Sequence, residues 1–164
     1  MSTLRIREAH AHDRDLLTQW ARAMALETEH KQLDESVVRA GIEAAIADPS
    51  KARYFVAMRE SAVAGRETIA EPAGTLMLTR EWSDWRNGDW WWIQSVYVAP
   101  AHRRQGVFAG LYRHVEALAR GTPGVVGLRL YVERENADAQ RTYESLGMVD
   151  AGYAIREVEF AAKG

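Results

Sequence analysis

The stretch that decides the fold, residues 96–108, reads Val96-Tyr97-Val98-Ala99-Pro100-Ala101-His102-Arg103-Arg104-Gln105-Gly106-Val107-Phe108. An apolar strand stops at a proline, a basic loop follows, and a helix begins near Gly106. The first amides of a helix lack internal partners and carry partial positive charge, so they favour a phosphate. Gly106 has no Cβ to keep a phosphate from the backbone, and Arg103 and Arg104 would add charge-assisted hydrogen bonds. Two interpretations remain open: an anion site, or a plain strand-turn-helix whose arginines are solvated.

The chain around this stretch alternates between the periods of strands and helices. Apolar spacing predicts helices over residues 13–29, 34–47, 105–120 and 136–146. β-prone runs predict strands over residues 3–7, 52–58, 74–79, 90–98, 125–132 and 152–160. Residues 60–73 are predicted to form a loop, and Asn87-Gly88 a hairpin turn. Consecutive strands favour antiparallel pairing, whereas the later strand-helix-strand units favour parallel pairing, so we expect a mixed sheet with helices on both faces.

Two segments resemble the GNAT superfamily of N-acetyltransferases. Residues 96–108 are similar to its acetyl-CoA motif, Arg/Gln-x-x-Gly-x-Gly/Ala, through Arg103, Gly106 and the preceding Val-x-Val-x-Pro. Phe108 stands where Gly or Ala is usual. Residues 136–148 resemble the family's Asn-x-x-Ala-x-x-x-Tyr-x-x-x-Gly-Phe segment, with Met148 in the last position. The resemblance implies one α/β (α+β) domain over residues 1–164, with a mixed, mostly antiparallel sheet of six to seven strands.

The resemblance also implies roles for residues in both segments. The backbone of Val96, Tyr97 and Val98 would pair with the pantetheine arm of acetyl-CoA, beside a β-bulge where the strand splays from its neighbour. An amide near Val96 or Tyr97 would face the thioester carbonyl. The pyrophosphate would be held by the loop and the helix start, which comprise Arg103, Arg104, Gln105, Gly106, Val107 and Phe108.

Asn136 and Tyr143 carry the roles that the second segment implies. Asn136 would contact acetyl-CoA, and Tyr143 would also contact it and act as the general acid for the CoA thiolate. Each has a plainer interpretation from the residues alone: Tyr143 as a core aromatic, and Asn136 as a helix cap.

The acceptor side is less defined. An amine must lose a proton before it attacks, and many enzymes of the family use a strand Glu, where this chain has Gln94-Ser95. Candidate substrate residues are Glu27, Trp82, Trp85 and Gln94. The tryptophans of residues 82–92 could hold a cationic acceptor, fill the core or form a dimer contact. The candidate bases are Glu27, Glu29, His30, Glu81, Asp84 and Glu133, and proton loss through water is equally open.

Composition narrows the function classes. The 164 residues carry a net charge of −2, which gives no basic footprint for nucleic acid. There is no cysteine, so disulfides and thiolate metal sites are excluded, and no apolar run approaches the roughly 20 residues that span a bilayer. His10, His12 and Asp13 precede a helix and have no distant ligands, so we expect no metal. A charged N-terminus without a signal favours the cytoplasm.

These observations predict an acetyl-CoA-dependent N-acetyltransferase that moves an acetyl group to a small-molecule or peptide amine by direct attack. We expect no nucleic-acid or membrane partner, and the resemblance allows a homodimer. The alternative is a non-catalytic GNAT-fold module that only binds acetyl-CoA. A third option is an interaction domain that uses the tryptophan-rich segment.

Overall fold

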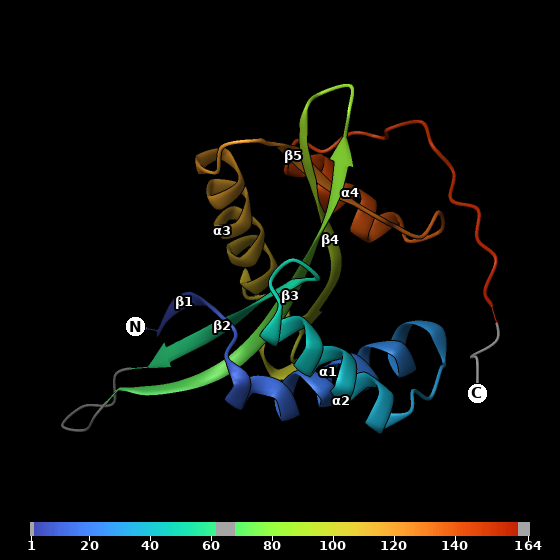
Figure 1. Ribbon diagram of the computed structural model, residues 1–164. Coiled ribbons are helices and arrows are strands. Elements are labelled where there is room, and N and C mark those ends of the chain that lie inside the picture. The colour runs from blue at the N-terminus through green and yellow to red at the C-terminus, as the bar shows by residue number, and fades with distance from the viewer. Residues whose placement is uncertain (1, 62–67, 161–164) are drawn as a thin grey trace. The chain divides into compact units, whose positions relative to one another are not determined.

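The computed structural model describes residues 2–61 and 68–160 (Figure 1). The chain divides into two compact units, Met1–Tyr131 and Val132–Gly164, which are described separately. The expectation of one domain over residues 1–164 stays a prediction.

The first unit is built on a curled, five-stranded sheet with the order β1-β2-β3-β4-β5. Its strands are β1 (Ser2–Glu8), β2 (Arg53–Ser61), β3 (Ile69–Ser83), β4 (Gly88–Val98) and β5 (Val125–Leu130). The pairs β1–β2, β2–β3 and β3–β4 are antiparallel, and β4–β5 is parallel. The predicted mixed, mostly antiparallel sheet is therefore confirmed.

The predicted count of six to seven strands is wrong, because the described residues form five. Residues 152–160 contain no regular secondary structure, and their side chains are all exposed. A strand needs a partner to pair its backbone groups, and no described strand pairs with this segment. The predicted loop over 60–73 is also too long: β2 and β3 extend to Ser61 and back to Ile69, and residues 62–67 lie outside the described residues.

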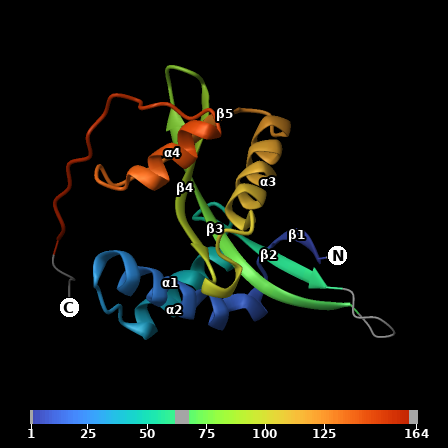
Figure 2. The same cartoon turned by 180° about the vertical axis from the view of Figure 1, so that it is seen from behind.

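Helices cover both faces of the sheet, as Figure 1 and the reverse view in Figure 2 show. α1 (Arg14–Glu29) and α2 (Glu35–Ala47) pack on one face, where Leu17, Ile42 and Val56 form a buried cluster. α3 (Val107–Gly121) lies on the other face, where the ring of His114 is 5.4 Å from that of Phe55. Neighbouring strand residues point to opposite faces, so Phe55 and Val56 anchor the two layers.

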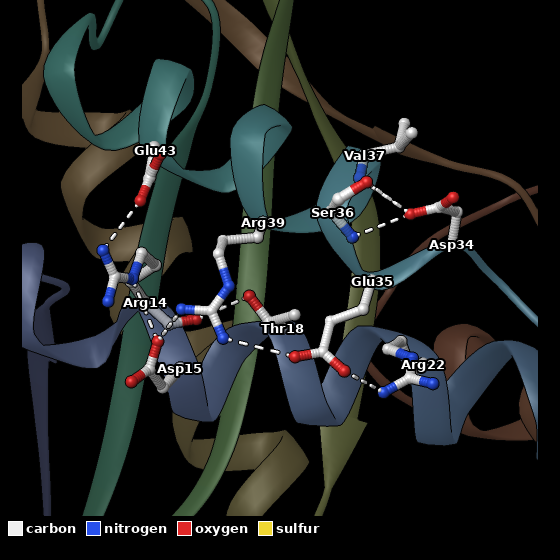
Figure 3. Close-up of polar contacts among 10 residues, drawn as sticks. All are labelled: Arg14, Asp15, Thr18, Arg22, Asp34, Glu35, Ser36, Val37, Arg39 and Glu43. Carbon is white, nitrogen blue, oxygen red and sulfur yellow. Dashed lines mark hydrogen bonds and ion pairs between the residues drawn. The ribbon is translucent and has the colours of Figure 1, made fainter.

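Ion pairs connect α1 with α2 across their exposed sides (Figure 3). Arg14 contacts Glu43 at 2.8 Å, and Arg22 contacts Glu35 at 2.7 Å. Arg39 bridges Asp15 and Glu35, one residue on each helix. Exposed pairs of this kind contribute little individually and are weakened by salt. The network aligns the two helices, while the buried cluster supplies most of their attachment.

Asp13, by contrast, is an anchor of the fold, with a side chain only 4% exposed. Arg7 of β1 donates two hydrogen bonds to its carboxylate, at 2.7 and 2.8 Å, and the His10 amide donates a third. Asp13 is the N-cap residue of α1, but its side chain accepts from the His10 amide and so caps the short 3-10 turn that precedes the helix. Burial opposes ionisation, yet these bonds and the charge of Arg7 outweigh it and hold the pKa of Asp13 below its ordinary value.

The Asp13–Arg7 pair predicts a pH-dependent stability. Because the pKa of Asp13 is lowered by folding, its contribution is present above the ordinary value of about 3.9 and is lost as pH falls through the lower folded value. Asp13→Asn leaves Arg7 without its counter-charge, so the free energy of unfolding at pH 7 should fall by about 3–5 kcal/mol. Urea unfolding at pH 7 and at decreasing pH measures this cost, which should shrink below about pH 4.

Asp15→Asn is the matched control, because Asp15 makes its ion pairs on the exposed side of α1. Its effect should be much smaller and should fade with added salt. Equal costs for the two substitutions would contradict the structural role assigned to Asp13.

The second unit contains α4 (Ala137–Ser145). The Asn136 side chain accepts a hydrogen bond from the Ala139 amide at 3.0 Å, which confirms the capping interpretation. Gly147 follows the helix with φ 86°, a conformation that glycine adopts at little cost.

Candidate active site

The site begins with a bulge in β4. Met77 of β3 pairs with Ser95, but the next residue, Leu78, pairs with Ile93, so Gln94 is the extra residue. The parallel ladder between β4 and β5 ends one residue earlier, at Ile93 and Leu130. Past the bulge, β4 therefore pairs only with β3, and no other described strand occupies its outer edge. Backbone groups on that edge can pair with an extended ligand.

Gly74 of β3 sets how closely the end of β4 approaches the start of α3. A Cβ at this position would lie 2.8 Å from the carbonyl oxygen of Tyr97 and 3.0 Å from Cγ1 of Val107. Backbone atoms cannot yield as a flexible side chain can. A residue larger than glycine would therefore separate the strand end from the helix start.

The start of α3 is open in the way that the sequence predicts. Gly106 is the N-cap residue, with φ 77°, and no side chain caps this helix among the described residues. A Cβ built on Gly106 would meet nothing within 4 Å, so the space in front of the backbone is clear. Arg104 also has a positive φ, 61°, which is uncommon for a residue with a side chain. The two left-handed residues turn the loop sharply into the helix.

The two arginines of this loop have different surroundings. Arg103 donates from Nη2 to Glu27 at 2.7 Å and from Nε to the Val98 carbonyl at 3.0 Å, and it lies over the ring of Tyr97. Arg104 is exposed, and its side chain makes no hydrogen bond or ion pair within the described parts of the chain. Arg104 is therefore the available cation beside the helix start, whereas Arg103 braces the loop against α1 and β4.

Glu27 and Tyr97 join the last turn of α1 to β4. The Tyr97 hydroxyl donates to Glu27 at 3.4 Å, and the ring of Trp20 packs against the Tyr97 ring, with 5.7 Å between centroids. Burial of Tyr97 and the negative charge of Glu27 raise the pKa of the phenol, so it stays protonated at neutral pH. Of the predicted substrate residues, the structure brings Glu27 to the loop and leaves Gln94 exposed at the bulge.

Trp82 and Trp85 lie at the far end of β4. The hairpin turn covers residues 84–87, ending on Asn87 with φ 47°, so Gly88 belongs to β4 and not to the turn. The two tryptophans are 61% and 86% exposed. Trp82 pairs with Asp89, which is about 26 Å along the strand from Tyr97 at a rise of ~3.3 Å per residue. The structure therefore does not bring them to the other candidate residues.

Of the remaining base candidates, Glu81, Asp84 and Glu29 have side-chain partners, His30 is the C-cap of α1, and Glu133 lies outside this unit. Glu81 contacts Arg129 and Trp92, and Asp84 accepts from the Trp85 amide at 2.9 Å. Glu29 pairs with Lys31 at 2.7 Å, and His30 ends α1 with φ 54°. Glu133 belongs to the second unit.

In the second unit, Tyr143 is half-buried on α4. Burial raises the pKa of its phenol, which keeps the proton in place at neutral pH. A general acid must be protonated before the reaction, so this state suits the predicted role.

Sequence reasoning missed two contacts. Glu27 and Arg103 are 76 residues apart, and only the sheet topology brings them together. Arg129 stacks on Trp90 with 4.1 Å between its Cζ and the ring. Arg129 is the single charged side chain in the apolar run of residues 125–132. A charge in such a run could have indicated from the sequence that Arg129 has a specific partner.

Comparison with known proteins identifies the class. The model of the acetyltransferase (GNAT) family matches residues 14–148, so the chain belongs to the GNAT acetyltransferase family. A structure described as a "possible acetyltransferase" from Clostridium difficile 630 has a TM-score of 0.84 and 38% identity, covering 97% of this chain and 99% of that one. A "probable acetyltransferase" structure has a TM-score of 0.77 and 24% identity, with coverages of 97% and 99%.

More distant neighbours share the fold alone. A ribosomal-protein-alanine N-acetyltransferase from Brucella melitensis biovar Abortus 2308 has a TM-score of 0.69 and 16% identity, covering 96% of this chain and all of that one. No curated protein sequence matches the chain. The described helices include none long and apolar enough to cross a membrane, and residues 2–61 and 68–160 hold no group of three or more His, Cys, Asp or Glu suited to a metal.

The different surroundings of the two arginines predict different effects on CoA affinity. Arg104→Ala removes an available cation beside the helix start, so CoA should bind roughly 10–100-fold more weakly, as expected for hydrogen bonds to a charged group. Arg103→Ala should weaken CoA binding less and should lower thermal stability more, because Arg103 braces α1 against β4. Isothermal titration with CoA and thermal unfolding measure the two effects.

Arg113→Ala is the control, because Arg113 is another exposed cation on α3, beyond its first turn. It should change neither measurement. An equal loss of CoA affinity in Arg113→Ala and Arg104→Ala would mean that only the overall charge matters.

Proposed function

We propose that this chain transfers an acetyl group from acetyl-CoA to the amine of a small molecule or peptide. The observation that carries the proposal is the open outer edge of β4 past the Gln94 bulge, followed directly by an uncapped helix start at Gly106. The edge suits the extended, amide-bearing pantetheine arm, and the helix start suits its pyrophosphate. These residues fit acetyl-CoA as a co-substrate, which supplies an activated thioester.

The backbone of Val96, Tyr97 and Val98 would bind the pantetheine arm as an added strand would. An amide near Val96 or Tyr97 would donate to the thioester carbonyl and stabilise the negative charge that develops on its oxygen. The residues proposed to hold the pyrophosphate end are Arg103, Arg104, Gln105, Gly106, Val107 and Phe108. Among them Arg104 would supply the direct charge contact, and Arg103 would fix the loop.

We propose Tyr143 as the general acid that protonates the departing CoA thiolate, with Asn136 as a second contact to the cofactor. The amine attacks the thioester directly, so no acetylated enzyme forms, and no cysteine is required. The raised pKa of Tyr143 supports its role because the phenol holds its proton up to high pH.

Glu27 is our candidate for receiving the proton of the acceptor ammonium, directly or through water. The bulge carries Gln94, which has no ionisable group, and Glu27 is a carboxylate that the structure brings to β4 through Tyr97. Its side chain is 43% exposed, so water can carry the proton onward. A non-catalytic acetyl-CoA-binding module is the second candidate, and it is favoured by the neutral Gln94 at the bulge.

Tyr143→Phe tests the acid role. The substitution removes the proton donor and keeps the ring, so kcat should fall by roughly 10²–10⁴ while CoA affinity stays unchanged. Release of CoA thiol with a panel of amines measures kcat, and titration calorimetry measures affinity. Tyr153→Phe, in an 81% exposed tyrosine, is the control and should behave as the unmodified chain does. Undiminished turnover in Tyr143→Phe would remove this residue from the mechanism.

Glu27→Gln tests the base. Loss of the carboxylate should lower kcat/KM most at neutral pH and least at high pH, where the amine is already deprotonated. Glu27→Gln also loses the ion pair to Arg103, so Arg103→Ala serves as the control for that contact. If both variants show the same pH profile, Glu27 acts only as a brace for the loop.

A further inference from the structure

Arginines of this chain already occupy the tryptophan faces of β4. Arg129 and Arg86 lie over the Trp90 ring, with Cζ at 4.1 and 5.1 Å from its centroid. Arg53 lies over Trp91 at 5.6 Å, and Arg129 is also 6.0 Å from the Trp92 ring. A cationic acceptor held on these faces would have to displace a guanidinium. The tryptophan faces are therefore already covered by guanidinium groups, of which Arg53 and Arg129 are also paired with Glu8 and Glu81.

Arg129 is held on several sides and keeps hydrogen-bonding capacity. Nη1 donates to Glu81 at 3.0 Å, and the side chain is 25% exposed. Nε and Nη2 have no acceptor among the residues that the structure describes. Glu81 is itself fixed by the Trp92 indole N–H. A guanidinium oriented by stacking, with two donors unused, is suited to a carboxylate, which accepts from such a fork with little loss of freedom.

Arg129 lies on the same face of the sheet as the Glu27–Tyr97 contact. Thr75 pairs with Tyr97, and Thr79 pairs with Trp92. Since residues four apart on a regular strand share a face, the rings of Tyr97 and Trp92 point to the same side despite the bulge between them. Arg129 is the β5 partner of Trp92 and stacks on rings of that side.

Arg129 is also next to the point where the two strands part. The pair Trp92–Arg129 comes directly before Ile93–Leu130, the last pair of the parallel ladder. The Arg129 guanidinium lies on this face over Trp90, so it would meet the part of an acceptor that extends from the opening along β4, while Glu27 lies on the other side of the opening. Glu27 is already balanced by Arg103, and Glu81 by Arg129, so neither carboxylate gives this face an excess of negative charge.

We propose that Arg129 binds a carboxylate of the acceptor, so that the preferred substrate is an amine that also carries a carboxylate, such as an amino acid or a short peptide with a free C-terminus. The inference rests on the proposed acetyl transfer and names the substrate class of that site. Polycationic amines are disfavoured because they would meet the guanidinium with charge of the same sign.

The test compares acceptors that differ only in the carboxylate. The pairs are methionine and methioninamide, phenylalanine and phenylalaninamide, and alanyl-alanine and its amide, with spermidine as the polycation. Both kcat/KM and the affinity for the CoA-bound protein are measured. Each acid should exceed its amide by roughly 10–100-fold in both quantities, the range expected for a hydrogen-bonded charge pair. The amide amines are less basic and more often deprotonated, so an acid preference would run against their reactivity.

Substitutions then locate the preference. Arg129→Gln should abolish the acid-to-amide ratio, and Arg129→Lys should restore part of it, since lysine keeps the charge without the fork. Glu81→Gln removes the competing carboxylate and should increase the ratio. Arg86→Gln is the control, because Arg86 stacks on the same ring from the hairpin turn and should leave the ratio unchanged. If Arg129→Gln does not fold, Arg129→Lys and Glu81→Gln still give opposite shifts.

Each outcome decides the proposal. Equal affinity for acids and amides, an unchanged ratio in the folded Arg129 variants, or a preference for spermidine would overturn it, even with acetyl transfer intact. Conversely, an Arg129-dependent preference in binding, with no turnover of any amine, would uphold the carboxylate site and contradict the transferase.

Discussion

The structure depends on one irregularity, the extra residue Gln94 in β4. Without this extra residue, β4 would pair with β3 in one continuous register. β4 would then have no bend at the point where its pairing with β5 ends. With it, the strand bends just past the last β5 pair, and its outer edge opens over the residues that precede the basic loop. Backbone groups that sheets ordinarily satisfy internally are thereby left for a ligand. The position of the helix start follows from the same bend, because Gly106 is only eight residues after Val98, the last residue of β4.

Arginine is used in this chain mainly to position other groups. Arg7 neutralises the buried Asp13, Arg103 joins α1 to the end of β4, and Arg129 stacks between aromatic rings. A guanidinium suits this work because it is planar, permanently charged and able to stack while donating hydrogen bonds. Arg104 differs from these three, since its side chain makes no hydrogen bond or ion pair in the described ranges. Within the basic loop, Arg103 is therefore the structural arginine and Arg104 the one available to a ligand.

Much of the fold could be predicted from the sequence, and the reasons are local. The strand ends before Pro100 because proline fixes φ and has no amide hydrogen to donate. The helix begins after Gly106 because glycine readily adopts the positive φ of that turn. The cap at Asn136 was predictable because asparagine is favoured at the N-cap position. The strand predicted over residues 152–160 was wrong because β-prone residues form a strand only where a partner strand is available. The local sequence does not show whether a partner is available. The ends of β2 and β3 could not be predicted from the sequence either, because these strands extend by cross-strand pairing into residues with weak strand preference.

The candidate site was predictable in part for the same reason. Its backbone elements lie within one continuous stretch, and the motif places them in order. The contacts among Glu27, Tyr97 and Arg103, and the stack of Arg129 on Trp90, depend on strand order and register, which join residues far apart in sequence. The same register separates Trp82 and Trp85 from the opening, although they are close in sequence to Trp90.

Gly74 shows how a residue that touches no ligand can restrict the evolution of a binding site. It lies on the central strand β3, where its missing side chain leaves room for the Tyr97 carbonyl and Val107. A larger residue at this position would push the end of β4 away from the start of α3 and would also lower stability, because the overlapping atom is backbone. A relative with the same loop but a larger residue in place of Gly74 would need a compensating shift in α3. Changes at Gly74 and at the start of α3 near Val107 should therefore occur together.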